Sequence, residues 1–225
     1  MFIMSCLSLK GGCGKSTICL NLAACLSSHA KVLVLDLDPQ RSVTRWSKQN
    51  KDFSLHVFPL DLDVKNPAIK FKHDLDKLIA ETNSNVVLID APPQLQDAAL
   101  LSALISDLIL IPVTPSPLDI WAAEAAVETG REARKERGAK KPKILLVPSR
   151  IQTGTVLGRE LSDTLAALGE PVGPGISQRV ALVESAITGQ TIDQYAATSP
   201  AHLEFKKLAK YILEIIGGKK HGSKK

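Results

Sequence analysis

The chain has 225 residues, of which 44% are hydrophobic and 23% charged, and its formal net charge is +5. These values are typical of a soluble globular protein and exclude global disorder, collagen-like repeats and low-complexity sequence. The length predicts a single domain with its own core over residues 1–216, followed by a basic flexible tail at residues 217–225.

Short aliphatic runs alternate with longer segments of helical periodicity along the chain. Strands are predicted at Phe2–Ser8, Val32–Leu37, Val86–Ile89, Leu108–Val113 and Ile144–Val147, with a weaker candidate at Leu55–Phe58 and a possible last strand at Val172–Ile176. Helices are predicted at Lys15–Ser28, Ser42–Gln49, Phe71–Thr82, Gln96–Ser106, Ile120–Arg137, Thr155–Leu168, Val180–Gly189 and Pro200–Ile216. Near-continuous apolar strands that alternate with helices indicate an α/β fold: a doubly wound, mostly parallel β-sheet with helices on both faces.

The cysteines and the apolar segments bear on compartment and membrane insertion. All four cysteines lie within the first 25 residues and no pair has C-x-x-C spacing, so we expect a reduced, cytoplasmic protein without a thiolate metal cluster. The apolar N-terminal segment runs directly into a glycine-rich loop, which predicts a first strand rather than a signal peptide. The longest apolar stretch, Ala98–Val113, is interrupted by Asp107 and Pro112, so no transmembrane helix is predicted.

A glycine-rich loop between the first strand and the first helix is the strongest functional signal. It reads Lys10, Gly11, Gly12, Cys13, Gly14, Lys15, Ser16, Thr17. Glycines let successive backbone N–H groups curl around phosphate oxygens, and the N-terminus of the following helix adds positive charge. We expect Lys15 to reach the β- and γ-phosphates, Ser16 to ligate Mg²⁺ and Thr17 to bind the α-phosphate. Leu9 occupies the position of the standard motif's first glycine, and Cys13 needs only to be small, although a reactive thiol is an alternative for it.

This loop resembles the deviant Walker A motif of the ParA/MinD superfamily. Three further segments continue the resemblance in order: Leu35–Gln40 is similar to the family's D-x-D-P-Q segment, Leu88–Pro93 to its Walker B strand end, and Ile111–Asp119 to the proline-rich segment of small ParF-like partition ATPases. The resemblance covers residues 1–150 clearly and the remainder weakly. It implies a Mg²⁺-dependent ATPase that is slow without an adaptor protein.

The resemblance and the residue chemistry together suggest further site residues. Asp38 can orient water for attack on the γ-phosphate or hold a Mg²⁺-bound water, whereas Asp36 is expected to be a structural, buried carboxylate. Asp90, at the end of an aliphatic strand, should face the Mg²⁺ shell, unless it caps a helix. The resemblance implies that Lys10 crosses a dimer interface to the partner's phosphates, so that two subunits sandwich two ATP molecules.

The nucleotide base and the aromatic residues are less constrained by the sequence. We expect Gln40, Ser149 and Arg150 near the nucleotide, with Ile176–Gln178 behind them, although Arg150 could equally be a surface arginine. Trp46 and Trp121 could line the dimer interface, but the core is the simpler expectation for each.

Two basic segments suggest what the ATP-bound dimer binds. Residues 131–143 hold seven Lys and Arg against two Glu, and residues 206–225 hold seven Lys against Glu214. Such clusters favour the binding of double-stranded DNA without sequence preference. The resemblance implies that the protein associates with the nucleoid and is released by a cargo-bound ParB-like adaptor. It also implies that the cargo is a plasmid, a chromosome or a protein compartment such as a carboxysome.

The alternatives are weaker. The basic amphipathic segment Ala201–Ile216 could lie on a membrane as in MinD, but its apolar stripe more simply packs on the sheet, so no stable membrane association is expected. Iron–sulfur relatives need cysteines after Cys25, and the sequence has none there. Amidoligase-type relatives fit the proline-rich segment poorly, and the few residues before the first strand leave no room for an operator-binding helix-turn-helix.

Overall fold

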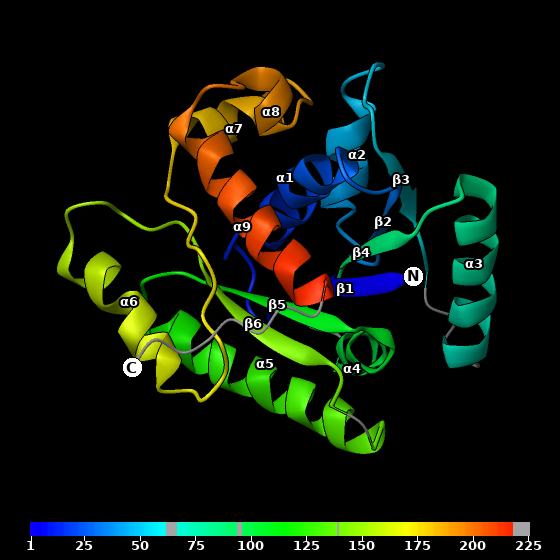
Figure 1. Cartoon of the computed structure of the whole chain (residues 1–225), viewed down its shortest axis with the longest axis horizontal. Coiled ribbons are helices and arrows are strands. Elements are labelled where there is room, and N and C mark those ends of the chain that lie inside the picture. The colour runs from blue at the N-terminus through cyan, green and yellow to red at the C-terminus, as the bar shows by residue number, and fades with distance from the viewer. Residues whose placement is uncertain (62–66, 94–95, 139, 218–225) are drawn as a thin grey trace.

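A computed structural model describes residues 1–61, 67–93, 96–138 and 140–217, so the predicted tail lies outside the described residues from residue 218 onward. Within these ranges six strands form one sheet in the order β3-β2-β4-β1-β5-β6, and every neighbouring pair is parallel (Figure 1). The strands are β1 Phe2–Cys6, β2 Val32–Asp36, β3 His56–Pro59, β4 Val86–Asp90, β5 Leu108–Val113 and β6 Lys143–Pro148.

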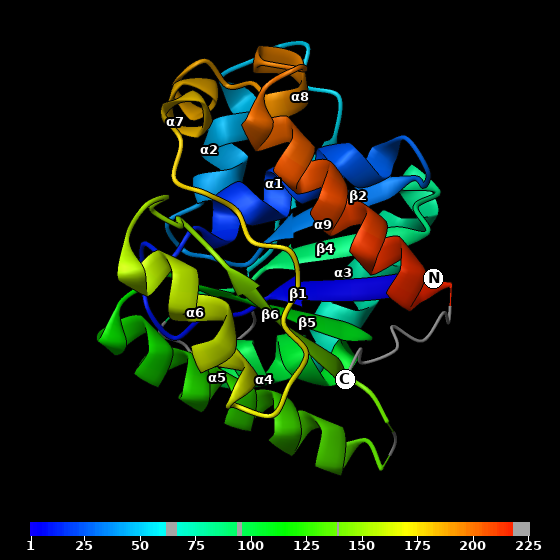
Figure 2. The same ribbon diagram turned by 60° about the vertical axis from the view of Figure 1, so that its left-hand side comes forward.

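Helices cover both faces of this sheet, as the two views in Figures 1 and 2 show. One layer contains α1 Lys15–Ser27, α2 Ser42–Lys48, α7 Val180–Ile187, α8 Ile192–Tyr195 and α9 Pro200–Ile216. The other contains α3 Pro67–Thr82, α4 Gln96–Ile105, α5 Pro117–Glu136 and α6 Val156–Ala166. The predicted doubly wound α/β fold is therefore confirmed.

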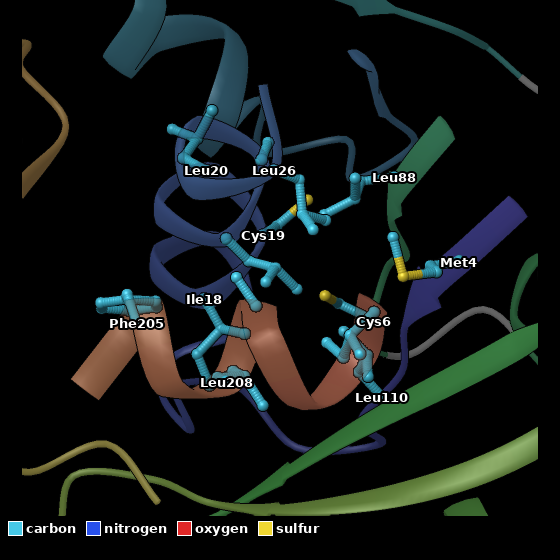
Figure 3. Close-up of a cluster of buried hydrophobic side chains, with 14 of the residues drawn as sticks. Met4, Cys6, Ile18, Cys19, Leu20, Leu26, Leu88, Leu110, Phe205 and Leu208 are labelled. Carbon is cyan, nitrogen blue, oxygen red and sulfur yellow. The ribbon is translucent and has the colours of Figure 1, made fainter. Parts of the chain in front are cut away.

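The core follows from the alternation of side chains along each strand. Met4 and Cys6 face the layer of α1 and α9, whereas Ile3 faces the opposite layer. Figure 3 shows the first of these clusters, in which Phe205 and Leu208 of α9 lie against side chains of α1 and the sheet. Each central strand is thus buried on both faces, which is why its sequence is continuously apolar.

The strand order also decides where a ligand can bind. From β1 the chain first builds one half of the sheet and later returns to the other side of β1 with β5 and β6. In open α/β sheets the crevice at the carboxyl ends of the strands, where the direction of winding reverses, is the usual binding site. The loop after β1, which is the glycine-rich loop, lies at this position.

Several predicted boundaries were wrong, each for a local reason. The first strand ends at Cys6 instead of Ser8, and α3 and α5 begin earlier than predicted, at Pro67 and Pro117, because proline is well tolerated in the first turn of a helix. The short helix α8 was not predicted.

The possible last strand at Val172–Ile176 was also wrong. This segment runs beside β6 and makes only two isolated parallel bridges, Leu146 to Val172 and Ile151 to Ser177. Pro171 and Pro174 have no N–H to donate, so a continuous hydrogen-bonded ladder cannot form.

The two tryptophans have different environments. Trp46 is buried, as expected, and its Nε1 donates to the Gln190 carbonyl at 3.0 Å. Trp121 was expected in the core but is 61% exposed. The buried face of α5 carries Ala123, Ala126 and Val127, and a residue two positions before Ala123 lies on the opposite side of the helix.

No helix in the described ranges is both long enough and apolar enough to cross a membrane.

Candidate functional site

The glycine-rich loop has the geometry of a phosphate-binding loop. Gly12 and Gly14 have φ angles of 85° and 93°, a region that favours glycine, and Gly14 is the N-cap of α1. A Cβ on Gly14 would also lie 2.9 Å from the Ser149 Oγ, so this position requires glycine twice over. The loop therefore directs its backbone and the N-terminus of α1 toward one space, an arrangement that binds anions.

The end of β6 braces this loop from the side. The Ser149 Oγ donates to the Cys13 carbonyl at 2.7 Å, and an Arg150 Nη1 donates to the Gly12 carbonyl at 2.8 Å. Both residues were predicted near the nucleotide and both line the cavity described below. The structure adds that these two side chains tie loop carbonyls to the segment that follows β6. Cys13 is buried, with its Sγ 3.7 Å from the Lys10 carbonyl, which favours the packing role over the reactive thiol.

Two aspartates, one at the end of β2 and one two residues later, have different roles. The fully buried Asp36 accepts hydrogen bonds from the Thr44 N–H and Oγ1, both at 2.8 Å, and from the Asp38 N–H at 3.2 Å. It therefore fixes the start of α2 and the turn that carries Asp38, as predicted for a structural carboxylate. The Asp38 side chain accepts from the Gln40 N–H at 2.9 Å and lines the cavity with Gln40.

Asp90 stands beside Asp36 in the sheet and faces the start of α1. Its Oδ2 accepts from the Ser16 Oγ at 2.6 Å, whereas its Oδ1 is buried without a partner among the described residues. Burial raises the pKa of Asp90 to about 7; the Ser16 hydrogen bond and the Lys15 charge oppose this rise, and the charges of Asp36 and Asp38 add to it.

These residues suit Mg²⁺ held together with phosphates. No group of three or more His, Cys, Asp or Glu side chains in the described ranges could form a complete metal cage. Mg²⁺ commonly uses one or two protein oxygens and completes its octahedron with waters and substrate phosphates. The Ser16 hydroxyl and the unpartnered oxygen of Asp90 fit this requirement, with Asp38 as a further carboxylate at the same edge of the sheet.

Lys10 lies on the outer side of the loop. Its Nζ is 2.6 Å from the Asp119 Oδ1 in the first turn of α5, and its side chain is 41% exposed. The other oxygen of Asp119 accepts from the Thr114 hydroxyl. In this single chain Lys10 therefore pairs with α5 and is not among the lining residues of the cavity described below, and its predicted reach into a partner stays a prediction.

A cavity of about 630 Å³ unites most of these residues. Its lining includes Asp38 and, of the residues predicted near the nucleotide, Gly11, Gly12, Gly14, Lys15, Ser16, Thr17, Gln40, Ser149 and Arg150. The predicted residues Lys10, Cys13 and Asp90 are not among the lining residues. Ile176–Gln178 also line it, as expected. Trp46 and the α7 residues Leu182, Val183 and Ala186 line it as well. The sequence reasoning missed them there, because their apolar pattern is indistinguishable from that of core residues.

Glu204 on α9 holds the far wall of the cavity. It accepts from the Ser177 N–H and Oγ, both at 2.9 Å, and from an Arg179 Nη2 at 2.7 Å. Burial raises the pKa of Glu204, but the hydrogen bonds from Arg179 and Ser177 outweigh it, so the net pKa is lowered. The sequence contained no sign of this link between residues 27 positions apart.

Comparison with known families identifies the family of the chain. The family model of the CobQ/CobB/MinD/ParA nucleotide-binding domain matches residues 4–192, which include the loop and all three aspartates. The chain belongs to this nucleotide-binding family. The ParA/MinD resemblance found in the sequence motifs is therefore confirmed.

Members of the family differ in the cargo that their names record. The chain is 34% identical over 199 residues to the maintenance of carboxysome distribution protein A of Halothiobacillus neapolitanus, covering 87% of this chain and 88% of that protein. It is 25% identical over 229 residues to the chromosome-partitioning ATPase Soj of Thermus thermophilus, covering 91% and 92% of the two chains.

Solved structures of the ParA/MinD type share the fold. A plasmid partition protein of Borrelia burgdorferi bound to AMPPNP superposes with a TM-score of 0.76 at 22% identity, covering 95% of this chain and 99% of that one. An ATP complex of a Cyanothece McdA variant gives 0.74 at 18% identity, covering 100% and 99%. MinD of Aquifex aeolicus gives 0.77 at 18% identity and covers both chains fully.

Proposed function

We propose that this chain is an ATP-dependent positioning ATPase of the ParA type. The observation that carries the proposal is the convergence, at one edge of the parallel sheet, of the phosphate loop, the cavity, Asp38, and the Ser16–Asp90 pair. Lys15, itself buried in the first turn of α1, neutralises phosphate charge. Asp38 orients the attacking water, and Ser16 and Asp90 hold Mg²⁺, which when bound stabilises charge on the phosphate oxygens.

ATP binding drives formation of a sandwich dimer in this proposal. Exposed apolar side chains support it, because Leu118 and Trp121 in the first turns of α5 and Val180 and Val183 on α7 are each at least 59% exposed. The start of α5 and α7 lie at the same end of the molecule as the phosphate loop in both views (Figures 1 and 2). A second copy would cover these side chains and bring its Lys10 to the γ-phosphate.

The dimer binds double-stranded DNA without sequence preference through exposed lysines. The first basic segment is only partly available, because Arg131 and Arg134 pair with Glu170, and Lys141 pairs with Asp107. In the part of the chain that the structure describes, its exposed residues Lys135, Lys140 and Lys143 form no ion pair, and the same holds for Lys206, Lys207 and Lys210 of α9. These two sets in each subunit double in the dimer and give salt-sensitive binding through avidity.

A ParB-like adaptor on the cargo stimulates ATP hydrolysis and thereby releases the dimer from DNA. The cargo then follows the ATPase that remains bound to the nucleoid. We place this cycle in the cytoplasm. The relatives named for carboxysome distribution and chromosome partitioning support a protein compartment or a DNA molecule as the cargo. The MinD-like alternative is less favoured, since the apolar stripe of α9 (Phe205, Leu208 and Ile212) is buried against the sheet layer.

The test is binding of the full chain to random-sequence duplex DNA without nucleotide, with ADP and with ATP. Asp38→Ala holds the ATP state, and Lys15→Ala removes nucleotide binding as the matched control. We expect DNA binding only with ATP, in wild type and Asp38→Ala, and a loss of affinity as salt rises. Equal binding in all three nucleotide states, or none in any, contradicts the proposal; binding to anionic vesicles in place of DNA would move the chain to the MinD-like alternative.

A further inference from the structure

A second concave surface lies between the C-terminal end of α1 and the outer face of α9. This groove has a volume of about 560 Å³, and its lining includes Cys25 from α1 and Leu203 and Leu213 from α9. The 13 residues of α1 separate it by about 20 Å from the phosphate loop, so it is not part of the nucleotide cavity.

The groove combines an apolar floor with a basic rim. The apolar surface comes from Leu203, Ala209, Leu213 and the half-buried Cys25. Burial raises the pKa of the Cys25 thiol to about 12, Asp193 adds a smaller effect in the same direction, and Lys206 opposes the rise. Lys206, Lys207 and Lys210 also line the groove. No carboxylate lines it, and none of the three lysines forms an ion pair within the described ranges.

We propose that this groove, the α1–α9 groove, binds an acidic amphipathic helix of a protein partner. The lining residues of α9 span ten positions from Leu203 to Leu213, about 15 Å, which matches roughly three helical turns. Apolar side chains of the partner helix fill the recess beside Leu203 and Leu213. Carboxylates that flank this stripe pair with Lys206, Lys207 and Lys210, and the pairing gives the interface its charge complementarity.

Other occupants match this surface less well. Residues 218–225 of the chain carry four lysines and no acidic residue, so the lysine rim repels them. Duplex DNA presents phosphates and has no apolar group to fill the floor. A bilayer is flat and reaches only the outermost of these side chains, whereas the apolar floor is recessed between two helices.

The proposal is tested by fluorescence anisotropy with the full chain and a labelled helical peptide of about 14 residues, with leucines at i, i+3, i+4 spacing and glutamates on either side of that stripe. We expect saturable binding that is the same without nucleotide, with ADP and with ATP. The triple variant K206E/K207E/K210E should weaken it at least tenfold, and so should L203S, whose side chain is 51% exposed and whose loss does not endanger the core. A peptide with Gln in place of Glu should not bind.

The matched control is K135E/K140E/K143E, which changes the net charge equally at a distant surface and should leave the affinity within about twofold. Circular dichroism melting confirms that each variant is folded. Absence of peptide binding, or equal weakening by both triple variants, overturns the proposal. A third result also overturns the proposal: the chain binds duplex DNA or anionic phosphatidylglycerol vesicles more tightly than the peptide, and K206E/K207E/K210E abolishes that binding whereas K135E/K140E/K143E does not. These lysines would then serve a polyanion or a lipid surface. Lys206, Lys207 and Lys210 are also candidates for DNA contact in the proposed function, so peptide binding is measured without DNA. Failure of peptide binding leaves ATP-gated DNA binding and the proposed ATPase function standing.

Discussion

Asp36 and Asp90 lie side by side on β2 and β4, yet their surroundings give them opposite effects on stability. Asp36 accepts three hydrogen bonds from the start of α2 and its preceding turn, which repay its burial. Asp90 has one hydroxyl donor and one oxygen without a partner in the described part of the chain. An uncompensated buried carboxylate costs folding free energy, and we interpret this cost as the consequence of keeping a metal ligand ready.

We therefore predict that Asp90→Asn stabilises the nucleotide-free protein. Because the folded pKa of about 7 exceeds the usual value of 3.8, the folded state binds the proton more tightly, and stability from this group is lost as pH rises from about 4 through 7. The variant should raise the free energy of unfolding by roughly 1–4 kcal/mol at pH 8 and by less at pH 5, as thermal melts measure, and Mg²⁺-ATP should no longer stabilise it.

The control for this prediction is Asp36→Asn, measured by the same thermal melts. It should lower stability by about 1–3 kcal/mol, because an amide cannot accept all three hydrogen bonds with the same strength. Destabilisation by Asp90→Asn at pH 8 would show that the carboxylate has favourable contacts beyond those described.

The pairing of Lys10 with Asp119 leads to a second residue-scale prediction. If Lys10 acts on a partner's phosphates, the ion pair within the single chain must first break. The pair is partly exposed, so its strength is below about 1 kcal/mol, and Asp119→Asn should strengthen ATP-dependent dimerisation by at most about fivefold while keeping the Thr114 contact. Sedimentation at several protein concentrations measures this. Lys10→Ala should abolish the ATP dimer, and a weaker dimer for Asp119→Asn would argue against the competition.

At the scale of elements, α9 serves two parts of the molecule with different faces. Its apolar stripe completes the core beside α1, as Figure 3 shows for Phe205 and Leu208. Glu204, on a neighbouring face, fixes Ser177 and Arg179 in the wall of the nucleotide cavity. The helix is thus attached to the core and to the binding site at once.

We predict that Glu204→Gln lowers both stability and nucleotide affinity. Because the pKa of Glu204 is lowered in the folded state, its ionised form stabilises the fold fully at pH values above its usual pKa of 4.5. This contribution disappears as the pH falls through the lower pKa of the folded state. The loss should be about 1–2 kcal/mol at pH 7 and smaller at pH 3. Thermal melts at both values measure it, and calorimetric titration with ADP should show weaker binding. A loss that is equal at both pH values would mean that packing, and not charge, is responsible.

At the scale of the whole molecule, exposed apolar side chains gather around the edge of the sheet that holds the nucleotide cavity. Trp121 on α5 is 61% exposed and Val183 on α7 is also 61% exposed, although the two helices lie in opposite layers. Large exposed apolar side chains on a single face are typical of protein interfaces.

Trp121→Arg is therefore predicted to prevent the ATP dimer without affecting the fold. Since the side chain is mostly exposed in the single chain, the free energy of unfolding without nucleotide should change by less than about 0.5 kcal/mol. Light scattering with ATP in the Asp38→Ala background should show a monomer, and the affinity for ADP should stay unchanged. Ile69→Arg on α3, which replaces a more exposed apolar residue away from this edge, is the control and should leave the dimer intact.

Most of the fold could be predicted from local patterns. The apolar runs of β1, β2, β4, β5 and β6 and the phosphate loop before α1 depend on short-range rules of periodicity and turn chemistry, so they are readable in the sequence. The segment at Val172–Ile176 was misread because its composition suits a strand while its prolines cannot complete a ladder. Trp121 was misplaced because an aromatic residue near an apolar segment does not reveal which side of its helix it occupies.

The sequence by itself determined the family and the parallel α/β architecture, and it predicted which loop residues bind phosphate. Only the tertiary structure decided that Ser149 and Arg150 brace the loop carbonyls, that Lys10 pairs with Asp119, that much of the Arg131–Lys143 charge is already neutralised, and that Glu204 holds the cavity wall. The reason is physical: a motif is set by neighbours along the chain, whereas the partner of a charged or polar side chain is set by residues that folding brings together from distant positions.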